Sequence, residues 1–150
     1  MLETGAKLPA LKLADDSGQQ ISTKDLVGKP LVVYFYPKDD TPGCTNEATQ
    51  FRDLSDDFEK KGAVVVGVSR DSVASHQKFK AKYEIPFQLL ADVDSELCDA
   101  FGVIVEKNMY GKKSIGIQRS TFLFDAKGKL VAVWPKVVVD GHAEDVLSKI

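Results

Sequence analysis

Residues 31–45 read LVVYFYPKDDTPGCT, and the pattern of this stretch is the clearest indication of the fold. Its first part, Leu31–Tyr36, is a continuous run of apolar, β-branched and aromatic residues, which is typical of a strand buried on both faces, as parallel strands are. Pro37 ends the run. Thr41 is a suitable helix N-cap, and the proline behind it suits the first helical position. The stretch therefore predicts a buried strand, a turn, and a helix with Cys44 in its first turn.

The rest of the chain alternates strand and helix patterns around this junction. The expected strands are 11–13 and 20–22, which form a hairpin, then 63–68, 87–90, 121–124 and 130–134; the expected helices are 72–83, 94–101 and 141–150, and the helix after Thr41 is expected to end near Gly62. This order predicts an α/β fold of the thioredoxin-like kind, with a central mixed β-sheet and helices on both faces. No repeat or linker divides the sequence, so residues 1–150 are expected to form a single domain.

The composition is that of an ordinary globular protein, with 43% hydrophobic residues, 28% charged residues and a net charge of −2. This balance argues against nucleic-acid binding, which normally needs a basic excess. We interpret Lys107, Lys112 and Lys113 as a solvated loop. The first ten residues lack the apolar core of a signal peptide, and the longest apolar run, 31–36, is too short to span a membrane. Two cysteines do not make a disulfide scaffold, so a cytoplasmic location is expected.

Cys44 is the most informative side chain because of its position. The free backbone N–H groups and the dipole at a helix start favour an anion, and the thiolate is the nucleophilic form of cysteine. Cys44 shares a helical stripe with Ala48 and Phe51, so it should face inward over the end of the sheet, where ligand sites of open α/β sheets form. A lone cysteine can also be a small core residue. The Thr-Pro-Gly lead-in at a strand-to-helix junction favours a reactive thiol.

Several motifs along nearly the whole chain carry a family resemblance. They are YFYPKD at 34–39, TPGCT at 41–45, GVS at 67–69, SH at 75–76, FGV at 101–103 and RSTF at 119–122. On these motifs the chain resembles peroxiredoxins of the bacterioferritin-comigratory-protein or peroxiredoxin Q group. The resemblance implies a thiol-dependent peroxidase that reduces hydrogen peroxide and organic hydroperoxides through a cysteine sulfenic acid, without a cofactor or a metal.

The resemblance also implies roles for individual residues. Cys44 would be the nucleophile, and Arg119 would favour its thiolate and bind the peroxide oxygens. Thr41 would hold the peroxide through its hydroxyl, Pro37 would form a wall of the pocket, and Glu47 would orient the arginine. Without the resemblance, Arg119 would be interpreted as a surface arginine and Thr41 as a helix cap. Pro37 would be a strand terminator, and Glu47 a glutamate in the first turn of a helix.

The chain departs from the family pattern in its second cysteine. Many members carry a resolving cysteine at the position of Thr49, others carry it on the next helix, and residues 72–83 contain none. Cys98 lies beside the apolar pair Leu97 and Phe101 of a short helix, and we favour a packing role for it over the alternative of a resolving cysteine. A disulfide with Cys44 would need the two Cα atoms within about 7 Å. We therefore predict a one-cysteine cycle in a monomer, with thioredoxin, or glutaredoxin with glutathione, as the reductant.

Other functions are less well supported by the residues. A dithiol oxidoreductase needs a second cysteine three residues after Cys44, where Glu47 stands. A cysteine hydrolase needs a histidine base, and His76 and His142 are interpreted as exposed helix or turn residues. Metal-ligand spacing is lacking, and GKKS at 111–114 lacks the upstream glycine of a phosphate loop. A redox sensor or chaperone that keeps the fold remains an alternative, which steady-state turnover would distinguish.

Overall fold

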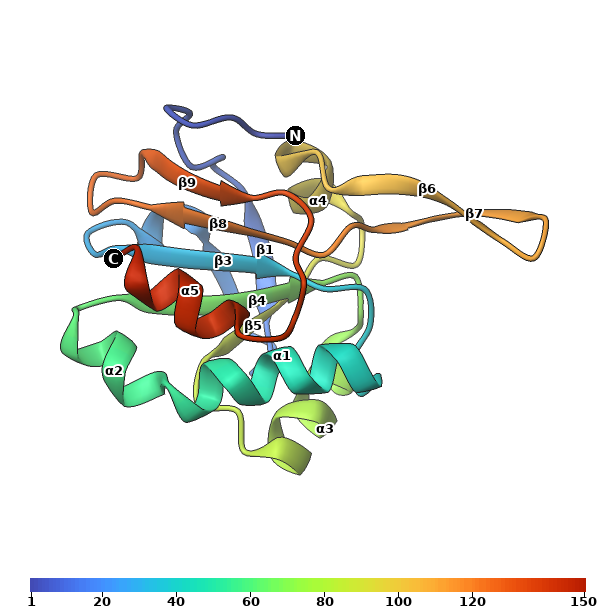
Figure 1. Ribbon diagram of the computed structural model, residues 1–150, viewed down its shortest axis with the longest axis horizontal. Helices are drawn as coiled ribbons and strands as arrows, with labels where there is room; N and C mark the ends of the chain where they lie inside the picture. The colour runs from blue at the N-terminus through green and yellow to red at the C-terminus, as the bar shows by residue number, and fades with distance from the viewer.

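The computed structural model describes residues 1–150, except for the side chain at position 109. The strands are β1 Lys12–Asp15, β2 Gln20–Ser22, β3 Leu31–Phe35, β4 Val64–Ser69, β5 Gln88–Ala91, β6 Ile104–Met109, β7 Lys112–Ile117, β8 Ser120–Phe124 and β9 Leu130–Trp134. The helices are α1 Pro42–Asp53, α2 Ser55–Lys60, α3 Val73–Tyr83, α4 Glu96–Phe101 and α5 His142–Ser148, with a 3-10 helix, η1, at Thr23–Leu26. Figure 1 presents their arrangement.

The main sheet is mixed, with the strand order β2-β1-β5-β4-β3-β8-β9. Strand β3 pairs in parallel with β4 and antiparallel with β8, and β4 pairs in parallel with β5. Every residue of β3 is buried, as its apolar run predicts. Its side chains alternate between the faces, since Val33 and Phe35 belong to one hydrophobic cluster and Val32 and Tyr34 to the other.

Helices cover both faces of this sheet. Helix α4 packs on one face through Leu97 and Phe101, whereas α1, α2, α3 and α5 lie on the other (Figure 1). The two faces are therefore two separate hydrophobic clusters divided by the strands. This arrangement confirms the predicted mixed sheet with helices on both faces.

Two local predictions were wrong. The predicted single helix ending near Gly62 is two helices, because Leu54 leaves the helical conformation (φ −100°, ψ 8°) between α1 and α2. The predicted solvated loop around three lysines is the β6–β7 hairpin, which extends away from the body (Figure 1). Most of β7 is solvent-exposed, so it lacks the apolar alternation that marks a half-buried strand. The signal that was missed is Tyr110-Gly111, whose positive φ values make the two-residue turn.

Antiparallel pairing of β3 with β8 brings distant segments together at one edge of the sheet. The register joins Phe35, the last residue of β3, to Ser120, the first residue of β8. Arg119 precedes Ser120, and the loop that leads to α1 follows Phe35. The pairing therefore carries Arg119 to the end of the sheet where α1 begins.

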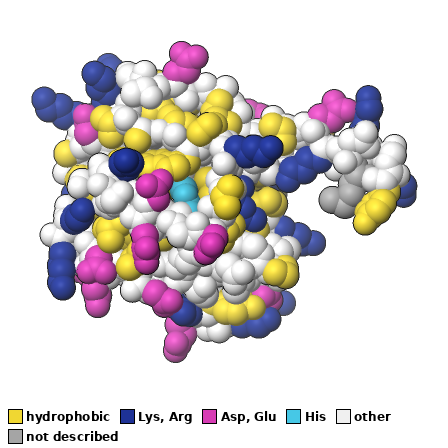
Figure 2. All heavy atoms as spheres, in the orientation of Figure 1, with side chains coloured by type: hydrophobic (Ala, Val, Ile, Leu, Met, Phe, Trp, Pro, Cys, Tyr) yellow, Lys and Arg dark blue, Asp and Glu magenta, His cyan; other side chains and the backbone are white. Residues whose placement is uncertain are grey.

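The surface carries charges of both signs. Figure 2 shows Lys and Arg side chains interspersed with Asp and Glu on the face in view. A mixed surface of this kind agrees with the near-neutral net charge of −2. Across the part of the chain that the structure describes, no helix has both the length and the apolar character needed to cross a membrane.

Candidate active site

Cys44 lies in the first turn of α1, as its sequence context predicts. Its side chain is 1% exposed and packs in the cluster that includes Tyr36 and Ala48. Thr41 occupies the N-cap position with an extended backbone, and Pro42 is the first helical residue. The Thr41 hydroxyl donates to the carbonyl oxygen of Lys38 at 2.9 Å, so its side chain bonds within the loop and does not cap the helix.

Arg119 reaches Cys44 from the other side of the site. Its Nη2 lies 3.4 Å from Cys44 Sγ, in hydrogen-bonding geometry. Gly43 makes this approach possible, because a Cβ atom at that position would lie 3.1 Å from Nη2. The structure thus brings together Cys44 and Arg119, which the family resemblance had paired across 75 residues.

Glu47 holds the guanidinium on its far side. Its Oε1 accepts a hydrogen bond from Arg119 Nη1 at 2.7 Å, and the Glu47 side chain is fully buried. Burial raises the pKa of Glu47 to about 7, although Arg119 acts in the opposite direction. Burial works against the charge on Arg119, but Glu47 and Cys44 outweigh it and raise the pKa of the guanidinium. Arg119 is thus a cation shared between a carboxyl group and a sulfur.

Pro37 and Thr41 belong to the segment that joins β3 to α1. We call residues 37–41 the active-site loop. Pro37 is half-buried at its start, next to the fully buried end of β3, and Thr41 is half-buried at its end. The loop therefore leads from the sheet edge to the helix turn that bears Cys44.

Cys98 is not part of this constellation. It is buried on α4 in the cluster on the opposite face of the sheet from Cys44. Its backbone N–H donates to Asp92 Oδ2 at 2.7 Å, and burial, together with Asp92, raises the pKa of the Cys98 thiol. Both cysteines are free thiols. The predicted packing role agrees with this position, because a buried thiol kept protonated is a poor nucleophile.

The interpretation of both histidines as exposed residues was wrong. His76 is fully buried, and its ring nitrogens face Asp39 Oδ2 at 2.7 Å and the Leu90 carbonyl at 2.9 Å. His142 is 4% exposed, and its Nε2 lies 2.7 Å from Thr121 Oγ1. Burial lowers the pKa of His142 to about 4, so the ring is neutral. The burial of both residues was missed because their neighbours in sequence are polar, whereas their bonding partners come from other elements.

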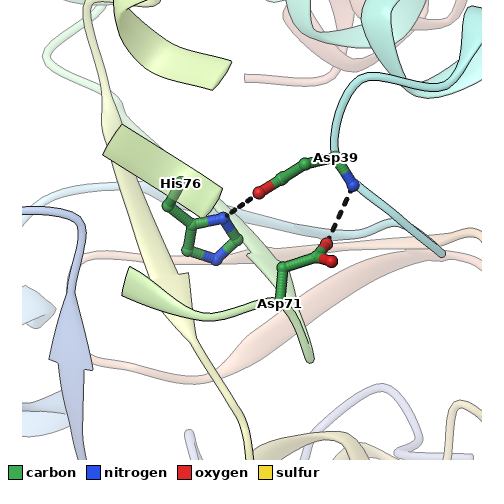
Figure 3. A group of neighbouring side chains, drawn as sticks. All are labelled: Asp39, Asp71 and His76. Carbon is green, nitrogen blue, oxygen red and sulfur yellow. Dashed lines mark hydrogen bonds and ion pairs between the residues drawn. The ribbon is translucent and has the colours of Figure 1, made fainter. Parts of the chain in front are cut away.

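One cluster has the spacing of a metal site. Asp39, Asp71 and His76 offer ligand atoms within 4.8 Å of one another (Figure 3). Each of these groups is already engaged, since His76 bonds Asp39 and the Asp39 backbone N–H donates to Asp71 at 2.8 Å. The cluster is therefore a hydrogen-bonded network, and it joins α3 to the active-site loop. Asp39 and His76 lie in motifs that carry the family resemblance, but neither was expected to contribute to the site.

Comparisons with known proteins identify the family of the chain. The family model described as the AhpC/TSA family matches residues 4–133. A Coxiella burnetii relative named as a peroxiredoxin bcp is 52% identical over 149 residues, which cover 99% of each chain. The Xanthomonas campestris protein named peroxiredoxin Bcp is 50% identical over 152 residues, covering 99% of this chain and 95% of that protein.

Solved structures agree as well. A structure of the Xanthomonas campestris bacterioferritin comigratory protein, described in terms of its alkyl peroxide reduction activity, superposes with a TM-score of 0.91 at 49% identity. The match covers 98% of this chain and 96% of that one. This likeness confirms the predicted thioredoxin-like fold. The chain therefore belongs to the AhpC/TSA family, within which it is a thiol peroxidase of the Bcp/PrxQ peroxiredoxin group.

Proposed function

We propose that this peroxiredoxin reduces hydrogen peroxide and organic hydroperoxides in a one-cysteine cycle, with Cys44 as the nucleophile and an external thiol as the reductant. The observation that carries the proposal is the contact of 3.4 Å between Arg119 Nη2 and Cys44 Sγ. A guanidinium that donates to the sulfur favours the thiolate, which is the form that attacks peroxides. The alkyl peroxide reduction described for the Xanthomonas campestris relative supports organic hydroperoxides as substrates.

The first step transfers one peroxide oxygen to sulfur. The Cys44 thiolate attacks that oxygen, the S–O bond forms, and the O–O bond breaks. Sulfur is oxidised to a sulfenic acid, and the other oxygen leaves as an alkoxide or hydroxide that takes up a proton from solvent. Arg119 can donate hydrogen bonds to both oxygens and stabilise the negative charge on the leaving one.

The active-site loop supplies the remaining contacts in this proposal. Because the Thr41 hydroxyl donates to Lys38, its oxygen acts toward a bound hydroperoxide as a hydrogen-bond acceptor. Pro37, which has no N–H, forms a wall that keeps water from the sulfur. Glu47 orients Arg119 through its 2.7 Å bond.

The second half of the cycle needs a thiol from outside the chain. That thiol condenses with the sulfenic acid, which releases water and forms a mixed disulfide, and a second thiol then restores Cys44. The location of Cys98 in the cluster on the other face of the sheet supports an external reductant, which we propose is thioredoxin, or glutaredoxin with glutathione. Since Cys44 is 1% exposed, the reductant reaches the sulfur only when the first turn of α1 moves.

We further propose that residues 1–150 work as one domain and as a monomer in the cytoplasm. Two free cysteines support that compartment, where glutathione and thioredoxin keep thiols reduced. The near-neutral net charge of −2 supports partners other than nucleic acids.

Two serine variants test this cycle. Cys44→Ser should abolish peroxide consumption, because it removes the nucleophile, whereas Cys98→Ser should retain it with an external thiol reductant. Mass spectrometry after one equivalent of peroxide should find a sulfenic acid or its further oxidation products at Cys44. An intact Cys44–Cys98 disulfide as the main product would refute the one-cysteine cycle, and activity in Cys44→Ser would refute the nucleophile.

A further inference from the structure

Helix α3 holds the active-site loop through a buried network around Asp39. Asp39 Oδ1 accepts a hydrogen bond from the Tyr36 hydroxyl at 2.6 Å. Its Oδ2 accepts from Ser75 Oγ at 2.8 Å and lies 2.7 Å from His76 Nδ1. The Asp39 backbone N–H donates to Asp71 Oδ2 (Figure 3). The same oxygen accepts from Ser69 Oγ at the end of β4. The middle of the loop is thus tied to α3 and β4 at once.

The bonding partners of His76 define its charge. Its Nε2 faces the Leu90 carbonyl, which can only accept a hydrogen bond, so this nitrogen must donate. Its Nδ1 lies 2.7 Å from Asp39 Oδ2, and the acceptor geometry of Asp39 together with the raised pKa of His76 favours this nitrogen as a second donor. A ring that donates from both nitrogens is an imidazolium. His76 and Asp39 are therefore a buried ion pair.

The charged and titratable groups around His76 favour that state. Asp39 comes from the active-site loop, Asp71 from the segment before α3, and the Tyr36 ring packs from the position directly after β3. Burial opposes the charge, but Asp39, the Leu90 carbonyl and Asp71 outweigh it and raise the pKa of His76. Burial and the neighbouring Tyr34 and Asp39 raise the pKa of Tyr36, so its hydroxyl remains a donor to Asp39.

A second attachment joins the far end of α3 to the next residue of the loop. Asp40 has a φ of +57°, which is a left-handed conformation that non-glycine residues rarely adopt. Its carboxylate accepts from Lys82 Nζ at 2.8 Å and from the Tyr83 hydroxyl. Backbone strain of this kind persists only where surrounding contacts hold it. Two consecutive loop residues are thus held by the two ends of one helix.

Building on the proposed function, we propose that His76 is a positioning residue for peroxide reduction. The Leu90 carbonyl fixes its ring, the ring holds Asp39, and Asp39 sets the conformation of the loop that carries Pro37 and Thr41 toward Cys44. His76 does not contact the reacting sulfur. Its effect is on how well the pocket fits a hydroperoxide, and not on whether Cys44 is ionised.

Two amide variants of His76 separate the two bonds of the ring. An asparagine amide nitrogen can take the place of Nδ1 and keep the bond to Asp39, whereas a glutamine amide nitrogen reaches the place of Nε2 and keeps the bond to Leu90. We compare the second-order rate constant for hydrogen peroxide with the rate of iodoacetamide alkylation of Cys44. The ratio of the two rates reports pocket fit, because alkylation depends on the thiolate and its access alone.

In His76→Gln the ratio should fall about tenfold or more, since small misplacements of a binding group cost this much in rate. His76→Asn should retain a larger part of the ratio. Lys78→Gln, at an exposed site on the same helix, is the control and should leave the ratio unchanged. The proposal is overturned if the ratio is unchanged in His76→Gln, if both rates fall in parallel, or if the two amide variants behave alike.

A second variant and two control proteins complete the experiment. If His76→Gln does not fold, Ser75→Ala removes one bond to Asp39 Oδ2 without leaving a buried charge unpaired, and it should lower the ratio about threefold. An unchanged ratio in Ser75→Ala then overturns the proposal. The parent protein and Cys44→Ser are measured under the same conditions as these variants. If the parent consumes no peroxide through Cys44, the proposed function has failed; if it does and the ratio holds in the variants, only the positioning role has failed.

Discussion

At the centre of the candidate site, one cation is shared by two partners. Arg119 donates from Nη1 to Glu47 and from Nη2 toward the Cys44 sulfur, at 2.7 Å and 3.4 Å. Glu47 is fully buried, and its Oε2 has no hydrogen-bond partner among the residues whose side chains are described. Its bond to Arg119 becomes stronger when the carboxyl group ionises, because the guanidinium then faces a full opposite charge. The protonation of Glu47 thus controls how firmly the guanidinium is held.

This arrangement predicts a pH dependence at Glu47. Burial raises the pKa of Glu47 to about 7, so the carboxyl group is neutral below pH 7 and anchors Arg119 better above it. The rate with peroxide, divided by the alkylation rate of Cys44 at each pH, should rise about three- to tenfold through pH 7. Glu47→Gln should remove this step, because a neutral amide does not titrate. Stopped-flow measurements from pH 5.5 to 8.5 check it, and a step that survives in the variant contradicts it.

At the scale of elements, β4 is shaped by the strand beside it. Gly67 pairs with Tyr34 across the parallel β3–β4 ladder and lies beneath its ring. A Cβ atom at this position would lie 2.9 Å from Tyr34 Cζ and 2.9 Å from Leu89 Cδ2. The glycine is therefore required by packing between strands, although it interrupts an otherwise β-branched run.

Gly67→Ala should therefore destabilise the protein. Inserting a methyl group into a packed interior forces side chains or strands apart and costs about 1–3 kcal/mol in the free energy of unfolding. Gly116→Ala is the matched control. Its Cβ would meet the flexible end of the Lys107 side chain at 3.3 Å, so the change should stay within about 0.5 kcal/mol. Urea denaturation of both variants measures this, and equal stability of the two would contradict the packing argument.

Across the whole molecule, two buried histidines join elements that are distant in sequence. His76 links α3 to the active-site loop and to β5, and burial there is outweighed by Asp39, so its pKa is raised. His142 links α5 to β8 through Thr121, and burial lowers its pKa to about 4. Because the pKa of His76 is raised in the folded protein, protonated His76 stabilises the fold, and this contribution is lost as the pH rises through that pKa. The pKa of His142 is lower in the folded protein than in the unfolded chain. As pH falls below 6.5, the unfolded chain therefore binds a proton that the folded protein does not, and the fold loses stability.

His142 should therefore weaken the fold in acid. An unfolded histidine titrates near pH 6.5, so between pH 7 and pH 4.5 the buried ring costs about 2–3 kcal/mol of stability. His142→Gln should be less stable than the parent at pH 7, where it perturbs the bond to Thr121, and should recover by this amount at pH 4.5. Chemical denaturation of both proteins at the two pH values checks it. A stability difference that stays constant with pH would contradict the assignment.

Local patterns in the sequence specify most of the elements and the position of Cys44. The run Leu31–Tyr36, the N-cap position of Thr41 and the proline behind it specify a strand and a helix start through neighbouring residues alone, and Cys44 lies where they predict. The hairpin β6–β7 was missed because its strands are largely exposed, and apolar periodicity marks only elements that pack against a core. The break at Leu54 was missed because the apolar stripe continues through it to Phe58.

The tertiary structure decided which distant groups meet. Arg119 reaches Cys44 because the β3–β8 register joins Phe35 to Ser120, and no local pattern encodes a register between segments that far apart. Cys44 and Cys98 are separated because their helices, α1 and α4, pack on opposite faces of the sheet. The burial of His76 and His142 follows likewise from partners on other elements. Propensity and capping act between neighbours along the chain, whereas faces, registers and buried ion pairs exist only once the strands have paired.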